Sequence, residues 1–251
     1  MDISRYLQHI GFNGTPSVNL ATLQRLHHRH MLTVPFENLS IIYHQGINLA
    51  EQALFDKIVE HNRGGFCYEL NQIFGCLLQQ IGFDVVAISG EVRDPQGNFG
   101  PPFDHLALIV TLDHPYLVDV GFGDSFLTPL TLNTTQQQPQ ASGTFHLEHQ
   151  GEYYYLARRH GDRHSHAKTL YRFTLQPRAY SDFAAMCRYH SSSPESPFTQ
   201  KQLCSRPTEN GRVTLSDHKL IVTADHQRTE TTLQSEQQRR EALRQYFAIV
   251  L

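Results

Sequence analysis

The sequence predicts an α+β protein in which helices come first, strands follow and a small mixed region closes the chain. Apolar residues recur at helical spacing up to about residue 83. Short runs rich in β-branched and aromatic residues follow, with Gly and Pro between several of them. We therefore expect a helical lobe at 1–83, a β-rich lobe at 84–180 and a small α/β lobe at 181–251.

The first lobe is expected to contain three main helices, each with an apolar stripe on one face. They cover about 19–32, 49–62 and 66–83. Asn19 can cap the first helix through its side-chain oxygen, and Gly82 can end the third in the left-handed conformation that glycine tolerates.

The second lobe is expected to contain five short strands separated by turn residues. These strands lie at 84–93, 105–112, 116–122, 144–150 and 152–159. The sequence HQGEYY between the last two predicts a tight hairpin turn, and the polar stretch 131–143 predicts a loop.

The third lobe is expected to combine helices and strands. The patterns predict a helix at 181–192, two or three strands within 211–233 and a closing helix at 235–251. Ser235 can cap that last helix. No internal repeat is evident in the chain.

Composition and charge argue against several classes of function. The formal net charge is −3, whereas nucleic-acid binding needs a clustered surplus of basic residues. No apolar run of about 18 residues exists, so no membrane span is expected, and segment 1–18 is too polar for a signal peptide. Four cysteines without a CxxC pair predict reduced thiols and a cytoplasmic protein.

Histidine is abundant, with 16 residues, and two clusters of it raise the question of a metal site. The clusters are HHRH at 27–30 and HGDRHSH at 160–166. A metal ion needs ligands whose spacing lets them meet at one point. Because both clusters lie among polar and charged residues, we expect them on the solvated surface and expect no metal ion.

One cysteine has a setting that suits catalysis. Cys67 follows Gly64 and Gly65, which permit a sharp turn, and it stands where the third helix is expected to begin. A thiol in the first helical turn lies at the positive end of the helix dipole, which favours the reactive thiolate. A buried structural cysteine is the alternative. The other cysteines lack this setting and are expected to be packing residues: Cys76, Cys187 and Cys204.

His105 and Asp119 interrupt two expected strands that are otherwise almost wholly apolar. A buried imidazole needs a hydrogen-bond partner, and an aspartate is rarely buried unless it is paired. The two residues lie 14 apart, so a hairpin centred near Leu112 would place them opposite each other. A turn centred at His114 would place Ile109 opposite Asp119 instead, and the two residues could also be unrelated members of the core.

Together with Cys67, these residues predict a nucleophile, a base and an orienting acid. His105 would take the proton of the thiol, and Asp119 would fix the tautomer of the imidazole. A cysteine at a helix end that faces histidine and aspartate on strands is the papain-like arrangement. Several reactions share it, so the pattern predicts acyl transfer without naming a substrate.

Three segments resemble the arylamine N-acetyltransferase family in order, context and spacing. They are VPFENLS at 34–40, NRGGFCYELN at 62–71, and DHLALIV at 104–110 followed by VDVGFG at 118–123. The resemblance is dense from about Ile10 to Pro129. It implies a papain-like cysteine-triad fold with an N-terminal helical bundle that carries the cysteine, a central β-barrel that carries histidine and aspartate, and a C-terminal α/β lid.

The resemblance also implies a two-step cycle in which acetyl-CoA is a cosubstrate and no cofactor stays bound. The acetyl group would pass to Cys67 and then to an arylamine, an arylhydrazine or an N-hydroxyarylamine. The protein would act on these small molecules as a monomer or homodimer, with neither nucleic acid nor membrane as a partner.

Eight residues match positions to which the family gives a role. The resemblance implies catalysis by Cys67, His105 and Asp119, acceptor contacts by Phe36, Asp104 and Phe122, and contacts to a CoA phosphate through the amides of Gly121 and Gly123. A core phenylalanine is the alternative for Phe36, and a plain strand-end turn is the alternative for the GFG segment. Asp124 stands where some relatives carry a basic residue, which weakens the expectation of a phosphate contact there.

Other activities fit the same triad. A cysteine hydrolase or amidase would use water as the acceptor, and an amide synthase of the same fold would close a ring from a carrier-bound acyl chain. A binding module that keeps the fold without catalysis is a third alternative. The PFENL and VGFG segments favour the acetyltransferase over the hydrolase, which does not need them in this order.

Overall fold

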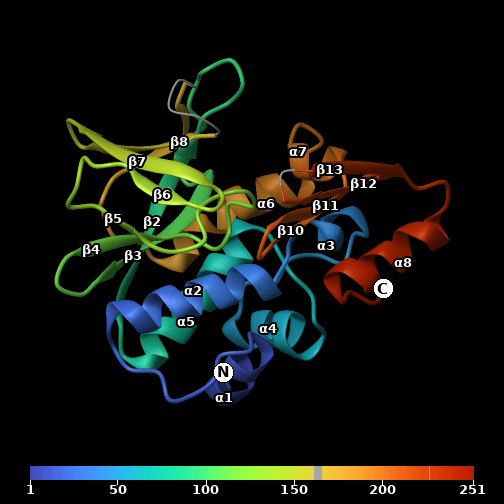
Figure 1. Ribbon diagram of the computed structural model, residues 1–251, viewed down its shortest axis with the longest axis horizontal. Coiled ribbons are helices and arrows are strands. Elements are labelled where there is room, and N and C mark those ends of the chain that lie inside the picture. The colour runs from blue at the N-terminus through green and yellow to red at the C-terminus, as the bar shows by residue number, and fades with distance from the viewer. Residues whose placement is uncertain (161–165, 226) are drawn as a thin grey trace.

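The computed structural model in Figure 1 describes residues 1–160, 166–225 and 227–251. Its helices are α1 (Ile3–His9), α2 (Leu20–Thr33), α3 (Leu39–Ile42), α4 (Glu51–Phe55), the π-helix η1 (Asp56–Glu60), α5 (Cys67–Ile81), the 3₁₀ helix η2 (Tyr180–Phe183), α6 (Ala184–Ser192), α7 (Pro197–Gln200) and α8 (Glu236–Phe247). Its strands are β1 (Phe36–Glu37), β2 (Asp84–Val92), β3 (His105–Thr111), β4 (Pro115–Val118), β5 (Leu130–Thr131), β6 (Gln138–Gln140), β7 (Gly143–Gln150), β8 (Tyr153–Arg159), β9 (Lys168–Phe173), β10 (Leu203–Thr208), β11 (Gly211–Ser216), β12 (Lys219–Ala224) and β13 (Gln227–Thr232).

Eight antiparallel strands, in the order β5-β4-β3-β2-β9-β8-β7-β6, form a sheet that curls into an almost closed barrel (Figure 1). Side chains join its two edge strands. The side-chain amide of Gln138 on β6 accepts from the backbone N–H of Thr131 on β5 and donates to its carbonyl, both at 3.0 Å. The side chain of Gln138 therefore replaces backbone hydrogen bonds between β5 and β6 and covers the two edges of the sheet there.

Helix α5 connects the helical bundle to the barrel. Its residues 67–78 are all buried, and it contacts α1 and α4 on one side and β2 and β3 on the other. Leu70 and Phe74 of this helix share one apolar cluster with Leu106 and Leu108 of β3. Since both faces of α5 are covered, its first residue is held firmly between the two parts.

A second sheet, in the order β1-β10-β11-β12-β13, lies beside the barrel and carries α8 (Figure 1). Strand β1 comes from the N-terminal third of the chain, and its Phe36 pairs with Ser205 of β10. Leu243 and Phe247 of α8 are buried in the apolar cluster of this sheet. The C-terminal part of the chain is thus tied to the segment that precedes α5.

Most of the expected elements are confirmed. The helices expected at 19–32 and 66–83 are α2 and α5. Asn19 caps α2 by accepting from the backbone amide of Thr22 at 2.8 Å, and Gly82 is left-handed with φ 110°. The HQGEYY hairpin is also confirmed, because β7 and β8 pair across a two-residue turn in which Gly151 has φ 63°.

Several boundaries are wrong. The helix expected at 49–62 is a short α4 followed by the π-helix, and the strand expected at 116–122 ends at Val118. The stretch 131–143, expected as a loop, contains β6 and the ends of two other strands. Strands β1, β9 and β10 were not expected, because their sequences have no clear period. They gain their stability from neighbouring strands in the sheet.

The expectation that HHRH at 27–30 is solvated is wrong for two of its histidines. His27 and His30 are fully buried. They fall on the same helical stripe as Leu23, Leu26 and Met31, so burial follows from the 3.6-residue period despite the polar residue type. In the second cluster His160 and His166 are exposed, and residues 161–165 lie outside the described part of the chain.

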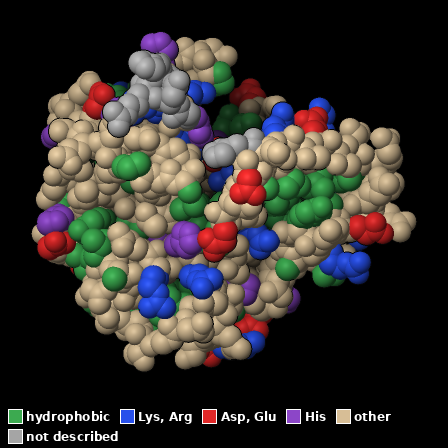
Figure 2. All heavy atoms as spheres, viewed as in Figure 1, with side chains coloured by type: hydrophobic (Ala, Val, Ile, Leu, Met, Phe, Trp, Pro, Cys, Tyr) green, Lys and Arg blue, Asp and Glu red, His purple; other side chains and the backbone are tan. Residues whose placement is uncertain are grey.

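Basic and acidic side chains are dispersed over the face of the molecule in Figure 2, in keeping with the small net charge. Within the described residues, no helix combines the length and the apolar character needed to cross a membrane.

Candidate active site

The N-terminal end of α5 is fixed by two chain segments that hydrogen-bond to each other. The amide of Glu37 donates to the carbonyl of Gly65 at 2.8 Å, and the amide of Gly65 donates to the carbonyl of Pro35 at 3.4 Å. A side chain at Gly64 would place its Cβ 1.9 Å from the Pro35 oxygen, so only glycine fits. The PFENL and RGGFC segments therefore form one unit that sets where Cys67 enters the helix.

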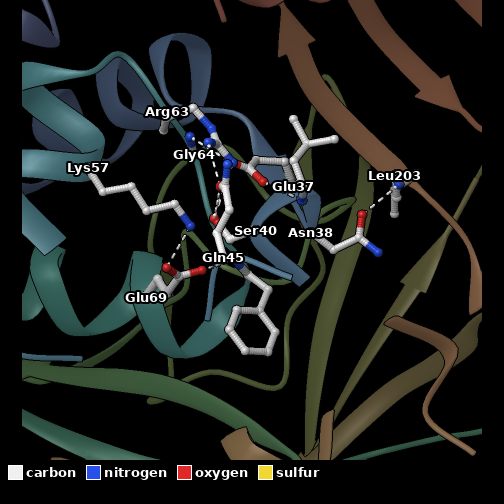
Figure 3. Close-up of polar contacts among 11 residues, drawn as sticks. Glu37, Asn38, Ser40, Gln45, Lys57, Arg63, Gly64, Glu69 and Leu203 are labelled. Carbon is white, nitrogen blue, oxygen red and sulfur yellow. Dashed lines mark hydrogen bonds and ion pairs between the residues drawn. The ribbon is translucent and has the colours of Figure 1, made fainter. Parts of the chain in front are cut away.

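A buried ion pair stabilises this unit (Figure 3). The carboxylate of Glu37, which is fully buried, accepts from Nε of Arg63 at 3.0 Å and from the amide of Gly64 at 3.2 Å. Arg63 also donates to Ser40 at 3.2 Å and to Gln45 at 3.3 Å. The two charges satisfy each other and hold the turn that precedes α5.

His105 and Asp119 lie at neighbouring positions of the barrel, but neither of the two hairpin registers considered from the sequence is the one that forms. Strands β3 and β4 pair so that Leu108 is opposite Val118, which centres the hairpin at Asp113. In this register His105 and Asp119 are diagonal neighbours on one face, a spacing within reach of long or aromatic side chains. Nε2 of His105 is 2.8 Å from Oδ2 of Asp119.

Four donors surround the carboxylate of Asp119, which is fully buried. Oδ2 accepts from His105 at 2.8 Å and from the hydroxyl of Tyr171 at 2.9 Å. Oδ1 accepts from the side-chain amide of Asn71 at 2.8 Å and from the backbone amide of Gly121 at 3.0 Å. Burial opposes ionisation of Asp119, but the charge of His105 and these donors hold its pKa below the ordinary value.

His105 links this carboxylate to the thiol of Cys67. Because Nε2 is bonded to Asp119, Nδ1 is the nitrogen that can bond to Cys67. Burial by itself would lower the pKa of His105, but the charge of Asp119 and hydrogen bonds to Asp119 and Cys67 raise it to about 10. The site can therefore hold an imidazolium between a carboxylate and a sulfur, which is how a cysteine nucleophile is activated.

This shift predicts a pH dependence of stability. We expect the free energy of unfolding to fall as pH rises from 6.5, the ordinary pKa of histidine, to about 10. Within this window the folded protein keeps the proton on His105 and the unfolded chain releases it, so the stabilisation is complete below the window and is lost through it. Urea unfolding of the wild type and of His105→Gln across the window measures the effect. Parallel curves for the two proteins would rule it out.

The GFG segment runs directly over the first residue of α5. A Cβ on Gly121 would lie 2.7 Å from Cα of Cys67, a backbone atom that cannot move aside. The ring of Phe122 stands edge-on to that of His105, with centroids 5.2 Å apart. Phe122 is therefore close to the imidazole, as its expected contact with an acceptor requires.

Phe36 and two other phenylalanines form an aromatic group beside this segment. Gly123 has φ 86°, and a Cβ there would lie 3.3 Å from the ring of Phe36. The ring of Phe198 on α7 is 6.2 Å from that of Phe36 and 5.7 Å from that of Phe66. The structure thus adds Phe198 to the two aromatic residues, Phe36 and Phe122, that the sequence singles out.

Two other expected contact residues are bonded within the protein. The carboxylate of Asp104 is 2.9 Å from Nε2 of His190 on α6, and the amide of Gly121 donates to Asp119. The expected contact of Asp104 with an acceptor, and those of Gly121 and Gly123 with CoA, stay predictions.

Asp124 joins the barrel to the second sheet. Oδ2 accepts from Arg158 of β8 at 3.1 Å, and Oδ1 pairs with Arg212 of β11 at 3.1 Å. Arg212 also donates to the carbonyl of Gly123. The end of the GFG segment is therefore held from both sheets.

Sequence reasoning misses several residues that build the site. Asn71 gives a usable signal, because a polar residue one turn after Cys67 interrupts a strongly apolar helix. Tyr171 gives none, because it lies on an unexpected strand, 52 residues from Asp119. The partnership of Glu37 and Arg63 is likewise visible only in the folded chain.

The fold and the geometry of the site define a papain-like cysteine-triad enzyme. A family model described as N-acetyltransferase matches residues 19–251. The chain belongs to the arylamine N-acetyltransferase family. Arylamine N-acetyltransferase 1 of Homo sapiens is 36% identical over 230 residues, which cover 84% of this chain and 79% of the human protein.

Solved structures of the family share the fold. The arylamine N-acetyltransferase of Mycobacterium smegmatis superposes with a TM-score of 0.91 at 32% identity, covering 99% of this chain and 92% of that one. The Mycobacterium marinum arylamine N-acetyltransferase in complex with CoA gives a TM-score of 0.90 at 28% identity, covering 99% and 93%.

Proposed function

We propose that this protein transfers an acetyl group from acetyl-CoA to arylamines, arylhydrazines or N-hydroxyarylamines through a thioester on Cys67. The observation that carries the proposal is the buried hydrogen bond between His105 and Asp119, beside the thiol of Cys67 that helps to raise the pKa of His105. Relatives named arylamine N-acetyltransferases support the substrate class, and the CoA complex of the Mycobacterium marinum protein supports CoA as the carrier.

In the first half of the cycle, the sulfur of Cys67 attacks the acetyl carbonyl of acetyl-CoA. His105 holds the proton of the thiol and gives it to the sulfur of CoA as the carbon–sulfur bond breaks. Asp119 orients the imidazole and stabilises its charged form. CoA leaves as a thiol, and the acetyl thioester remains on Cys67 with a neutral His105.

In the second half, the amine attacks the thioester carbonyl. His105 takes a proton from the amine, and Cys67 leaves as a thiolate, which restores the ion pair. An arylamine is a modest nucleophile, and holding it against the carbonyl can supply about 7 to 11 kcal/mol of the barrier. Phe36, Phe122 and Phe198 are the residues we propose for packing against the flat acceptor.

We assign a different part in the reaction to each of the three expected lobes. Residues 1–83 would carry the nucleophile, 84–180 the histidine and aspartate, and 181–251 would act as a lid. Contacts of Phe198 with Phe36, and of Arg212 with Asp124, support the last part, since both bring the C-terminal region to the site. Four free cysteines support a cytoplasmic location.

Incubation with acetyl-CoA alone is expected to add one acetyl group to Cys67, because no amine is present to remove it. Intact mass followed by peptide mapping measures this. The three other cysteines, all buried, are internal controls. Label on Cys76, Cys187 or Cys204, or no label at all, would contradict the proposal.

The same preparation separates the transferase from a hydrolase. CoA release should be slow with acetyl-CoA alone and should rise steeply when an aminobenzoate or another arylamine is added. Double-reciprocal plots should give parallel lines, as a covalent intermediate requires. Equal rates of CoA release with and without every amine tested would favour water as the acceptor.

A further inference from the structure

A fully buried histidine on α2, His27, is bonded to both ends of the segment 119–127. Its Nε2 accepts from the amide of Asp119 at 3.3 Å, and its Nδ1 is 2.8 Å from the carbonyl oxygen of Leu127. The imidazole also stacks on Phe126, with centroids 5.5 Å apart and an interplanar angle of 17°. One side chain therefore closes the segment that carries the proposed acid and the GFG residues.

The two bonds require one particular form of the imidazole. A carbonyl oxygen only accepts, so Nδ1 of His27 must carry a proton, and a backbone N–H only donates, so Nε2 must not carry one. Burial lowers the pKa of His27 to about 4, which keeps the ring neutral near neutral pH. This tautomer satisfies two backbone groups that burial would otherwise leave unpaired.

We propose that His27 is a positioning residue, which holds the backbone at Asp119 so that the carboxylate meets His105. The inference rests on the catalytic roles proposed above. Strand β4 ends at Val118, so regular strand pairing stops one residue before the acid. His27 binds the next amide along the chain and thereby fixes the backbone from which the Asp119 side chain extends. It acts through Asp119 and not on the reacting atoms.

His30 provides a matched comparison on the same helix. It is also fully buried, and its Nδ1 is 2.9 Å from the hydroxyl of Tyr6 on α1. Its bond leads into the helical bundle, whereas the bonds of His27 lead to the segment 119–127. If α2 simply needed buried histidines, substitutions of His27 and His30 would have the same effect on activity. The proposal predicts an effect for His27 alone.

His27→Met and His27→Gln form the test pair, because the two side chains are similar in length and only glutamine offers both a donor and an acceptor. We expect His27→Met to lower kcat of acetyl transfer by up to about 100-fold with little change in KM for acetyl-CoA, since a displaced acid misaligns the base. His27→Gln should retain most of kcat. His30→Met, corrected for the folded fraction, should match the wild type.

Alkylation of Cys67 by iodoacetamide tests the same inference without acetyl-CoA. In His27→Met, alkylation should slow at neutral pH and recover at alkaline pH, where the thiol ionises without help from the imidazole. His27→Gln and His30→Met should keep the profile of the wild type.

Four outcomes would overturn the proposal. They are an unchanged kcat and alkylation profile in His27→Met, an equal loss in His30→Met, no advantage of His27→Gln over His27→Met, and a His27→Met protein that does not fold. In the last case a role in folding alone would explain the residue. If the wild type transfers no acetyl group, the proposed function fails, and the alkylation comparison still decides the role of His27.

Discussion

Asp119→Asn is expected to lower the rate of acetyl transfer by a factor of about 10⁴ and to leave the fold intact. The oxygen of the new amide must occupy the Oδ1 position, because Asn71 and Gly121 both donate there and Asn71 is itself fixed by two further hydrogen bonds. The NH₂ group then faces His105 and donates to Nε2. The proton of the imidazole is forced onto Nδ1, the nitrogen that must take the proton of Cys67.

Steady-state kcat, with unfolding in urea as the check of folding, measures this effect. Asp113→Asn is the matched control, because Asp113 lies in the turn of the same β3–β4 hairpin and is exposed. The control should keep the activity of the wild type. An Asp119→Asn protein that is folded and nearly as active as the control would show that the carboxylate is only a polar group of the core.

Arg63→Ala is expected to lower the free energy of unfolding by about 3–5 kcal/mol. The substitution leaves the carboxylate of Glu37 fully buried and without its cation, while the backbone amides of Leu39 and Gly64 still donate to it. Such a loss is a large share of the about 5–15 kcal/mol that stabilises a typical domain. Because this ion pair holds the turn before Cys67, the variant should lose activity at the same temperature at which it unfolds.

Arg5→Ala is the control, because it makes the same substitution at an ion pair on the surface. Arg5 forms an ion pair with Glu60, but its side chain is 59% exposed, so its removal should cost about 0–1 kcal/mol. Urea unfolding of both variants and of the wild type gives the comparison. Equal stability of Arg63→Ala and Arg5→Ala would show that burial adds nothing to the Glu37 pair.

The local sequence pattern predicts those helices and turns whose stabilising residues lie close together in the chain. The apolar stripes of α2 and α5, the left-handed Gly82 and the turn at Gly151 all follow from neighbours within a few residues. The same period also carries the information that His27 is buried, although its polar residue type favours the opposite expectation. Histidine in an apolar stripe is therefore better judged by position than by residue type.

The sequence by itself determines the chemistry that is brought to the site. It contains a cysteine at the start of an apolar helix, and a histidine and an aspartate that each need a hydrogen-bond partner when they are buried. These requirements follow from the cost of burying polar groups, which holds whatever the exact path of the chain. The prediction that His105 and Asp119 lie together is therefore confirmed, although neither register considered for their hairpin is the one that forms.

Only the tertiary structure decides what holds these groups in place. Tyr171 reaches Asp119 from a distant strand, Arg63 meets Glu37 across 26 residues, and His27 binds the Asp119 amide across 92 residues. Such pairs leave no periodic trace in the sequence, because each residue is an ordinary polar side chain until packing removes water and leaves one partner within reach. The reacting groups can be read from the chain because each is a polar residue in an apolar segment. Their supporting partners cannot, because long-range packing alone decides which polar side chains meet.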